Sequence, residues 1–201
     1  AIVLSAPITL ALRTLPIGRT DGERGLRGIL IRALHSPLTK IITHPVVALA
    51  IFDGSLFALY FTPLFGNLMS SHLGHLFMDF HFIFAGILFF FVIIGIDPNP
   101  RSLHPFGRII ILFAAMSIHA FFSVALMSSK SLIDGGYYQL LQRPWSPDLL
   151  ADQKVGAAIG WAMGEIPILL ALIATFVMWS RSDAREARRA DQRSESDLKE
   201  Y

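Results

Sequence analysis

The chain contains no cysteine among its 201 residues. This absence excludes disulfide bonds, thiolate metal sites and thiol redox chemistry, so a metal site here would use His, Met, Asp or Glu. Charged residues are also few, at 16%, whereas 53% of the residues are hydrophobic. A typical soluble domain carries about 25% charged residues, so this composition favours a protein that crosses a membrane several times.

Several enzyme signatures are missing as well. The sequence has no HExxH pair, no glycine-rich phosphate loop and no GxSxG nucleophile elbow. We find no case for a hydrolase or an NTPase, and we expect a protein that is not an enzyme. The basic residues flank apolar segments, so membrane topology explains them better than nucleic-acid binding.

The apolar segments predict an all-α polytopic membrane protein, a helical bundle in one domain over residues 1–180. We expect four complete crossings, at 45–65, 73–96, 109–127 and 156–179, and a partial N-terminal one at 1–12 that ends a helix begun earlier in a longer protein. Residues 25–34 could form an amphipathic helix on the membrane surface. Residues 181–201 alternate in charge as a solvated helix would, and we interpret them as a charged cytoplasmic tail.

The distribution of positive charge predicts the orientation. Of the 17 Lys and Arg residues, 14 fall in the segment 13–43, the loop 98–108 and the tail. The positive-inside rule makes these parts cytoplasmic. The link 66–72 and the aromatic loop 128–155 are then extracytoplasmic.

Ionisable residues inside apolar segments are the main functional clue, because burying them in hydrocarbon is costly. At ~1.5 Å per residue, His81, His119 and Glu165 reach one depth in the outer half of the membrane. They predict a deeper metal site. His72, His75 and Asp79 share one helix face and predict an outer relay. Asp53, nearer the cytoplasmic side, is a candidate for a proton or ion pathway.

Methionines near these residues suggest the metal. Met78, Met116 and Met127 are candidate auxiliary ligands, and thioether with imidazole suits Cu(I). Each of these candidate ligands also has a structural interpretation. Methionines fill cores, an intramembrane histidine often hydrogen-bonds a neighbouring helix, and Asp79 could orient a histidine without touching a metal.

Five spaced motifs resemble one family. They are SHLGH at 71–75, MDFHF at 78–82, IGIDP at 94–98, HAFFSVALM at 119–127 and GWAMGEIP at 160–167. Together they resemble the CtaG family of cytochrome c oxidase assembly factors. The resemblance implies a bacterial plasma-membrane protein that helps to mature haem-copper oxidases, at the copper stage. In some bacteria the family is fused behind a CopD-like copper-transport domain, which would be an N-terminal part of the full-length chain.

The prediction is therefore a copper-binding oxidase assembly factor, whose partners are cytochrome c oxidase subunits and the lipid bilayer. Two alternatives stay open. One is an electron-transfer protein with b-type haem held between His81 and His119. The other is a structural accessory subunit of a respiratory oxidase, whose polar groups only join helices.

Overall fold

The computed structural model describes residues 6–16, 25–95, 97–99, 103–133, 136–145 and 148–199, with side chains as far as residue 192. Throughout these residues the secondary structure is helical, with no strand. The elements are α1 (Pro7–Thr14), α2 (Leu26–Leu34), α3 (Pro37–Ile42), α4 (Pro45–Leu49), the π-helix η2 (Ala50–Gly54), α5 (Ser55–Tyr60), α6 (Leu64–Met69), α7 (His72–Ile94), α8 (Pro105–Ser128), α9 (Tyr137–Leu140) and α10 (Leu149–Lys199).

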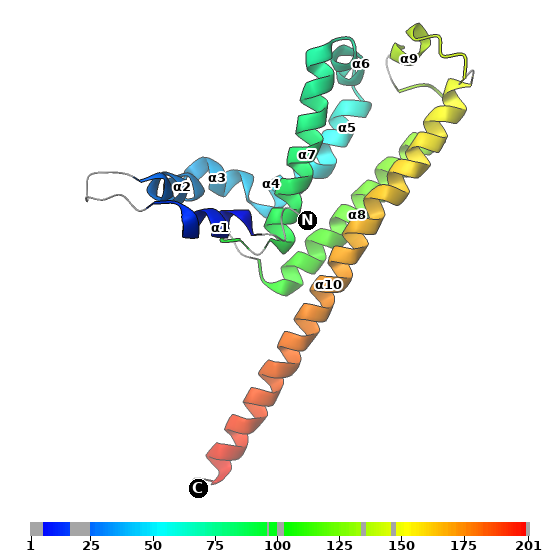
Figure 1. Ribbon diagram of the computed structural model, residues 1–201. Helices are drawn as coiled ribbons and strands as arrows, with labels where there is room; N and C mark the ends of the chain where they lie inside the picture. Colours follow the sequence, from blue (N-terminus) through cyan, green and yellow to red (C-terminus); the bar gives the residue numbers. More distant parts are fainter. Residues whose placement is uncertain are drawn as a thin grey trace.

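The long helices form two arms that meet near the end of α7 (Figure 1). One arm pairs α7 with the run α4–η2–α5, and α8 packs along α10 in the other. The two arms share a core that includes Ala48, Phe89, Leu112 and Ile168, one residue from each of α4, α7, α8 and α10. We call the opposite end, which carries α6 and α9, the loop end.

Local sequence explains where α7 and α8 begin and end. Ser71 is the N-cap of α7, and its side chain accepts a hydrogen bond from the Gly74 amide. Pro105 occupies the first turn of α8, where its missing N–H costs nothing. The predicted crossings at 73–96 and 109–127 thus correspond to α7 and α8, although residue 96 lies outside the described residues.

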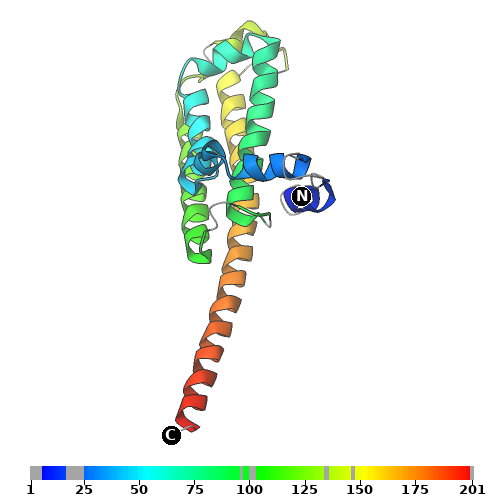
Figure 2. The ribbon, with the colours of Figure 1, turned by 90° about the vertical axis from the view of Figure 1, so that its left-hand side faces the viewer.

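The last predicted crossing, at 156–179, is part of a much longer helix. Helix α10 begins at Leu149 and continues through the charged segment to Lys199, passing Pro167 without a break. Figure 2 shows its C-terminal half extending well beyond the other helices. The tail is therefore helical as far as residue 199, and residues 200–201 lie outside the described residues.

The predicted crossing at 45–65 is shorter than expected. Its helical run ends at Tyr60, and Pro63 precedes the separate helix α6. Three helices in the described residues are long and apolar enough to cross a membrane, namely α7, α8 and the apolar part of α10. The run Pro45–Tyr60 is apolar but falls below that length.

The N-terminal helices lie across the direction of the long ones (Figures 1 and 2). The N-terminus of α1 is capped by Asp97, which follows α7 and accepts hydrogen bonds from the amides of Ile8 and Thr9, at 3.1 and 2.6 Å. Helix α2 coincides with the predicted amphipathic helix at 25–34. Residues 1–5 lie outside the described residues, so the partial crossing at 1–12 stays a prediction.

Candidate functional site

Asp53 is the most deeply buried carboxylate near the middle of the bundle. Its side chain is 1% exposed, and it belongs to the π-helix η2, the only π-helical turn in the residues described here. A π-turn within an α-helix shifts the side chains that follow it and is frequent at functional sites. Here it interrupts a run that would otherwise be a plain apolar helix.

His119, on α8, lies opposite Asp53. The ring nitrogen Nδ1 is 3.7 Å from the Asp53 carboxylate oxygen Oδ1, and the histidine side chain is 12% exposed. That separation is too long for a hydrogen bond. Both carboxylate oxygens and both ring nitrogens are buried without a hydrogen bond to any described residue. Because buried polar groups are nearly always satisfied, this pair is a strong candidate for a site that takes up a proton, a water or an ion.

A row of glycines on α10 makes room for the histidine. Gly156, Gly160 and Gly164 are four residues apart and so share one helix face. A Cβ placed on Gly164 would overlap the His119 imidazole, whereas one on Gly156 or Gly160 would meet no atom within 4 Å. Small residues at this spacing let membrane helices approach closely. Here the His119 ring packs against Gly164, and open space remains beside Gly156 and Gly160.

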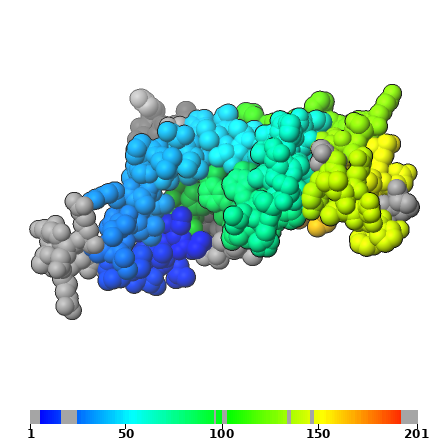
Figure 3. All heavy atoms as spheres, turned by 90° about the horizontal axis from the view of Figure 1, so that it is seen from above, coloured from blue at the N-terminus to red at the C-terminus, as the bar shows by residue number. Residues whose placement is uncertain are grey.

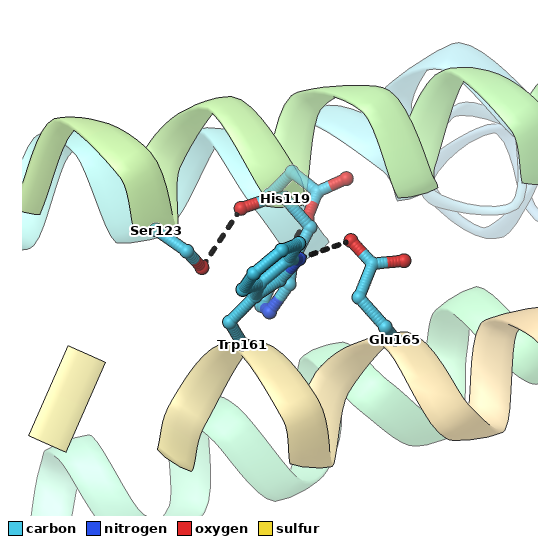
Figure 4. A network of polar contacts seen from close by, with 5 residues as sticks. His119, Ser123, Trp161 and Glu165 are labelled. Atoms are coloured by element: carbon cyan, nitrogen blue, oxygen red, sulfur yellow. Dashed lines mark hydrogen bonds and ion pairs between the residues drawn. The ribbon is translucent and has the colours of Figure 1, made fainter. Parts of the chain in front are cut away.

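Two neighbouring polar contacts frame His119 (Figure 4). Ser123 donates a hydrogen bond from its hydroxyl to the His119 backbone carbonyl, at 3.0 Å. The Trp161 indole N–H donates to Oε1 of Glu165, at 3.2 Å. Glu165 directly follows Gly164 along α10, so its backbone lies next to the imidazole. A role for the Glu165 side chain at the histidine stays a prediction.

A cavity of about 360 Å³ connects His119 with the loop end. Its walls are mainly apolar and aromatic, and include Tyr60, Phe122 and Leu126. Gly156 and Gly160 also line it, and their missing side chains are the reason that the space stays open. The cavity thus gives the buried ring a route toward the loop end.

Segments far apart in the sequence meet where the cavity reaches the loop end. Tyr138 belongs to α9, Arg143 follows that helix, and Asp152 and Gln153 belong to the first turns of α10. Figure 3 shows the α9 segment beside α6 and the start of α7. The Phe65 and Tyr138 rings are 6.0 Å apart, and the His75 and Tyr137 rings 6.2 Å apart.

The predicted outer relay lies away from this cavity. His75 Nε2 is 2.8 Å from the Met69 carbonyl, so the ring caps the end of α6. His72 and Asp79 are exposed. His81 lies between the rings of Phe77 and Phe82, with centroid distances of 5.9 and 5.4 Å. In the described residues these four side chains are not gathered at one point, and their role in metal binding stays a prediction.

The candidate methionine ligands have packing contacts. Met116 packs against the shared core, and Met127 packs against a second cluster formed by Phe122, Leu126 and Ala157. Met78 is half-buried on α7. Within the described part of the chain, no three His, Asp or Glu side chains lie close enough together to hold one ion.

Sequence reasoning selected both Asp53 and His119 but placed them in different sites. The two are 66 positions apart and sit on helices whose rotation is not encoded by either segment alone. One signal for the pairing was Asp53 itself, because a carboxylate within an apolar segment is costly to bury unless a polar partner lies near it. The glycine row at 156, 160 and 164 was a second signal, because it marks the face of α10 that a neighbour approaches.

Comparison with known proteins now places the chain. Residues 1–182 match the family model described as cytochrome c oxidase caa3 assembly factor (Caa3_CtaG). The chain belongs to this family. The CtaG resemblance inferred from the five motifs is thereby confirmed, and the match extends from the N-terminal helices into the start of the charged part of α10.

Relatives of this CtaG-family chain occur in mycobacteria. It is 42% identical, over 196 residues, to an uncharacterized protein of Mycobacterium bovis, and 42% identical, over 195 residues, to one of Mycobacterium leprae. These matches cover 98% and 97% of the chain but only 30% of each relative. The chain thus spans less than a third of the length of the curated relatives it matches. No solved structure matches it.

Proposed function

We propose that this chain is the membrane-embedded part of a cytochrome c oxidase assembly factor that carries Cu(I) on its way to an oxidase subunit. In this proposal His119 is the principal ligand, the cavity is the path, and Asp53 supplies the negative charge that offsets the ion. The role is that of a carrier and not of an enzyme. The family supports the process, since its members are described as assembly factors.

One observation carries the copper proposal: the imidazole of His119, whose two buried nitrogens make no hydrogen bond to a described residue, lies beside a buried carboxylate and lines a cavity. Imidazole is a good ligand for copper, and a carboxylate next to a bound cation lowers the cost of burying its charge. The chain has no cysteine, so its donors for copper are the thioether of Met, which is soft, and the imidazole of His. Met116, three residues before His119 on α8, is the nearest candidate along that helix.

The donor set fits transient binding better than a permanent centre. No group of three His, Asp or Glu side chains close enough to hold one ion is present among the described residues. An ion bound at His119 would therefore have few protein ligands and could leave readily. A carrier requires this property. The outer relay of His72, His75 and Asp79, and the contribution of His81 and Glu165 to the deeper site, stay separate predictions to be tested ligand by ligand.

The alternatives receive less support. A b-type haem ligated by His119 would need space at the ring, but the ring packs against Gly164, so a porphyrin could enter only by separating α8 from α10. A purely structural role predicts satisfied hydrogen bonds between helices, whereas the carboxylate of Asp53 and the ring of His119 make no hydrogen bond to the residues that the structure describes.

The first experiment measures bound metal and the absorption spectrum of the full-length protein, loaded with Cu(I) and purified in detergent. Wild type, His119→Ala and His81→Ala are compared, with the exposed His35 replaced by Ala as the matched control. We expect near-stoichiometric copper in wild type and in the His35 variant, and a loss of at least tenfold in affinity for His119→Ala.

The outcomes separate the candidate functions. Unchanged copper binding in His119→Ala would contradict the proposal, as would a Soret band in place of bound copper. Copper lost also in His81→Ala would show that the deeper site includes α7. Oxidase activity in membranes of cells that carry each variant tests whether bound copper serves assembly.

A further inference from the structure

At the loop end of the cavity, the guanidinium of Arg143 lies between two groups that attract cations. Its Nη2 donates a hydrogen bond to Oδ2 of Asp152, at 3.1 Å, and its Cζ lies 4.6 Å from the centre of the Tyr138 ring. A carboxylate and the face of an aromatic ring are two groups that attract cations. We call this place, formed by Tyr138, Arg143 and Asp152, the cavity mouth.

The guanidinium is held loosely enough to leave. The Asp152 side chain is 47% exposed, and an ion pair that exposed contributes little. Arg143 Nε is buried and makes no hydrogen bond to the described residues. Gln142, just before it, has a left-handed backbone, with φ 42°, which strains a residue other than glycine.

The segment on the other side of the mouth is fixed more firmly. Gln153, next to Asp152 on α10, accepts a hydrogen bond from the Ile133 amide at 3.0 Å and donates one to the Ser131 carbonyl at 3.3 Å. Asp152 is therefore held on a regular helix that is hydrogen-bonded to the segment after α8. Movement at the mouth is expected to come from Arg143, with its carboxylate partner staying in place.

We propose that the cavity mouth is a binding site for monovalent cations that Arg143 occupies as a tethered competitor, and that an incoming cation displaces it before reaching His119. The onward passage of the cation to His119 rests on the proposed function, whereas the site at the cavity mouth is inferred from the contacts of Arg143 alone. The site regulates entry: it admits cations, and it closes again when the guanidinium returns to Asp152 and Tyr138.

The test uses the natural absence of cysteine from this chain. Gly160 lines the cavity, and a Cβ there meets no atom within 4 Å, so Gly160→Cys places a thiol in the cavity without a clash. The full-length protein in detergent is treated with two methanethiosulfonates of similar size, one cationic and one anionic, and both labelling rates are measured. The parent protein without the added cysteine gives the background.

Removal of the competitor should open the mouth to cations first. In Arg143→Ala we expect labelling by the cationic reagent to rise about tenfold, and labelling by the anionic reagent to rise much less, because Asp152 is then unpaired. Adding Asp152→Asn to that variant should slow the cationic reagent about fivefold and leave the anionic one unchanged. Arg143→Lys, which keeps the charge but loses the planar fork, should give an intermediate rate.

Two controls isolate the mouth. Lys130→Ala removes one positive charge from an exposed position after α8 and should leave both labelling rates unchanged. Ala187→Cys, exposed on the charged part of α10 and far along the helix from Asp152, should be labelled equally fast with and without Arg143. Gel filtration of each variant verifies folding, and Arg143→Lys provides the test if Arg143→Ala elutes abnormally.

Unchanged labelling in Arg143→Ala would overturn the inference, and so would an equal rise for the two reagents, which would make Arg143 a steric plug. The proposed function fails separately, if His119→Ala retains its copper while the labelling response is intact. If His119→Ala loses its copper but Arg143→Ala shows no change in labelling, the cation site at the cavity mouth is rejected and the proposed copper-carrier function is retained.

Discussion

The start of α7 and the middle of α8 both carry histidine, and they differ in what surrounds it. Four ligand-type residues, His72, His75, Asp79 and His81, crowd the first ten positions of α7, yet His72 and Asp79 are exposed and His75 bonds a backbone carbonyl. The middle of α8 has a single histidine. That one is buried beside Asp53 and makes no hydrogen bond among the described residues.

The comparison teaches that a dense motif does not by itself make a site. Side chains at i, i+3 and i+4 share a helix face, so the α7 group is coherent along the helix. Whether that face meets another helix is a separate matter. His119 is distinguished by partners from elsewhere: Asp53 on the π-helix and Gly164 on α10.

The largest effect is expected where α10 touches the histidine ring. In Gly164→Leu the new side chain collides with His119, and overpacking of this kind costs about 1–3 kcal/mol or more. We expect a clearly lowered midpoint of thermal unfolding in detergent, together with loss of copper. Gly156→Ala, whose Cβ meets open space, is the matched control. Equal midpoints for the two variants would contradict the close packing of the ring.

The next effect concerns the buried pair. Asp53→Ala removes the carboxylate whose Oδ1 lies 3.7 Å from His119 Nδ1, and side chains in contact interact by about 0.5–3 kcal/mol. Asp79→Ala, which removes an exposed carboxylate from α7, is the control for the change in stability. A double-mutant cycle between Asp53 and His119 should give a coupling of about 0.5–3 kcal/mol. A coupling near zero would show that the two side chains do not interact.

A smaller effect is expected at the cap of α6. His75→Ala removes the bond to the Met69 carbonyl and should lower stability by about 1 kcal/mol. Copper affinity should stay within twofold of wild type if the cap is its role. Thermal unfolding and metal titration on one sample measure both, and a large loss of copper here would restore the outer relay.

The smallest effect is expected at Asp79. Since this side chain is exposed, Asp79→Asn should change stability by less than about 0.5 kcal/mol. Copper content and oxidase activity should match wild type. A deficit in either measurement, at normal protein levels, would place the start of α7 on the metal route and remove the contrast with α8.

The helices themselves could be predicted closely. Ser71 and Pro105 are local signals, and α7 and α8 begin within a few residues of the predicted crossings. The errors have local causes too. The run from Pro45 was extended past Tyr60 because Phe61 and Phe65 continue its apolar composition, while Pro63 separates a new helix. The prediction ends the last crossing at the charged residues, whereas α10 continues through them, because charged residues three or four positions apart are compatible with a helix.

The site was harder to predict for a physical reason. In a membrane the side of a helix that faces lipid is as apolar as the side that faces protein, so hydrophobic periodicity does not reveal which side packs inward. The sequence therefore singled out Asp53, His119 and Glu165 as ionisable residues in apolar segments but did not indicate that Asp53 lies beside His119, nor that a cavity is present.

By itself, then, the sequence determined an all-helical, cysteine-free, apolar chain of the CtaG family, because composition, caps and motif order are local properties. The tertiary structure alone decided that Asp53 meets His119, that Gly164 supports the ring, and that Gly156 and Gly160 leave a cavity open toward Arg143. These features depend on how each helix is rotated against its neighbours. That rotation is fixed by packing between segments distant in the chain.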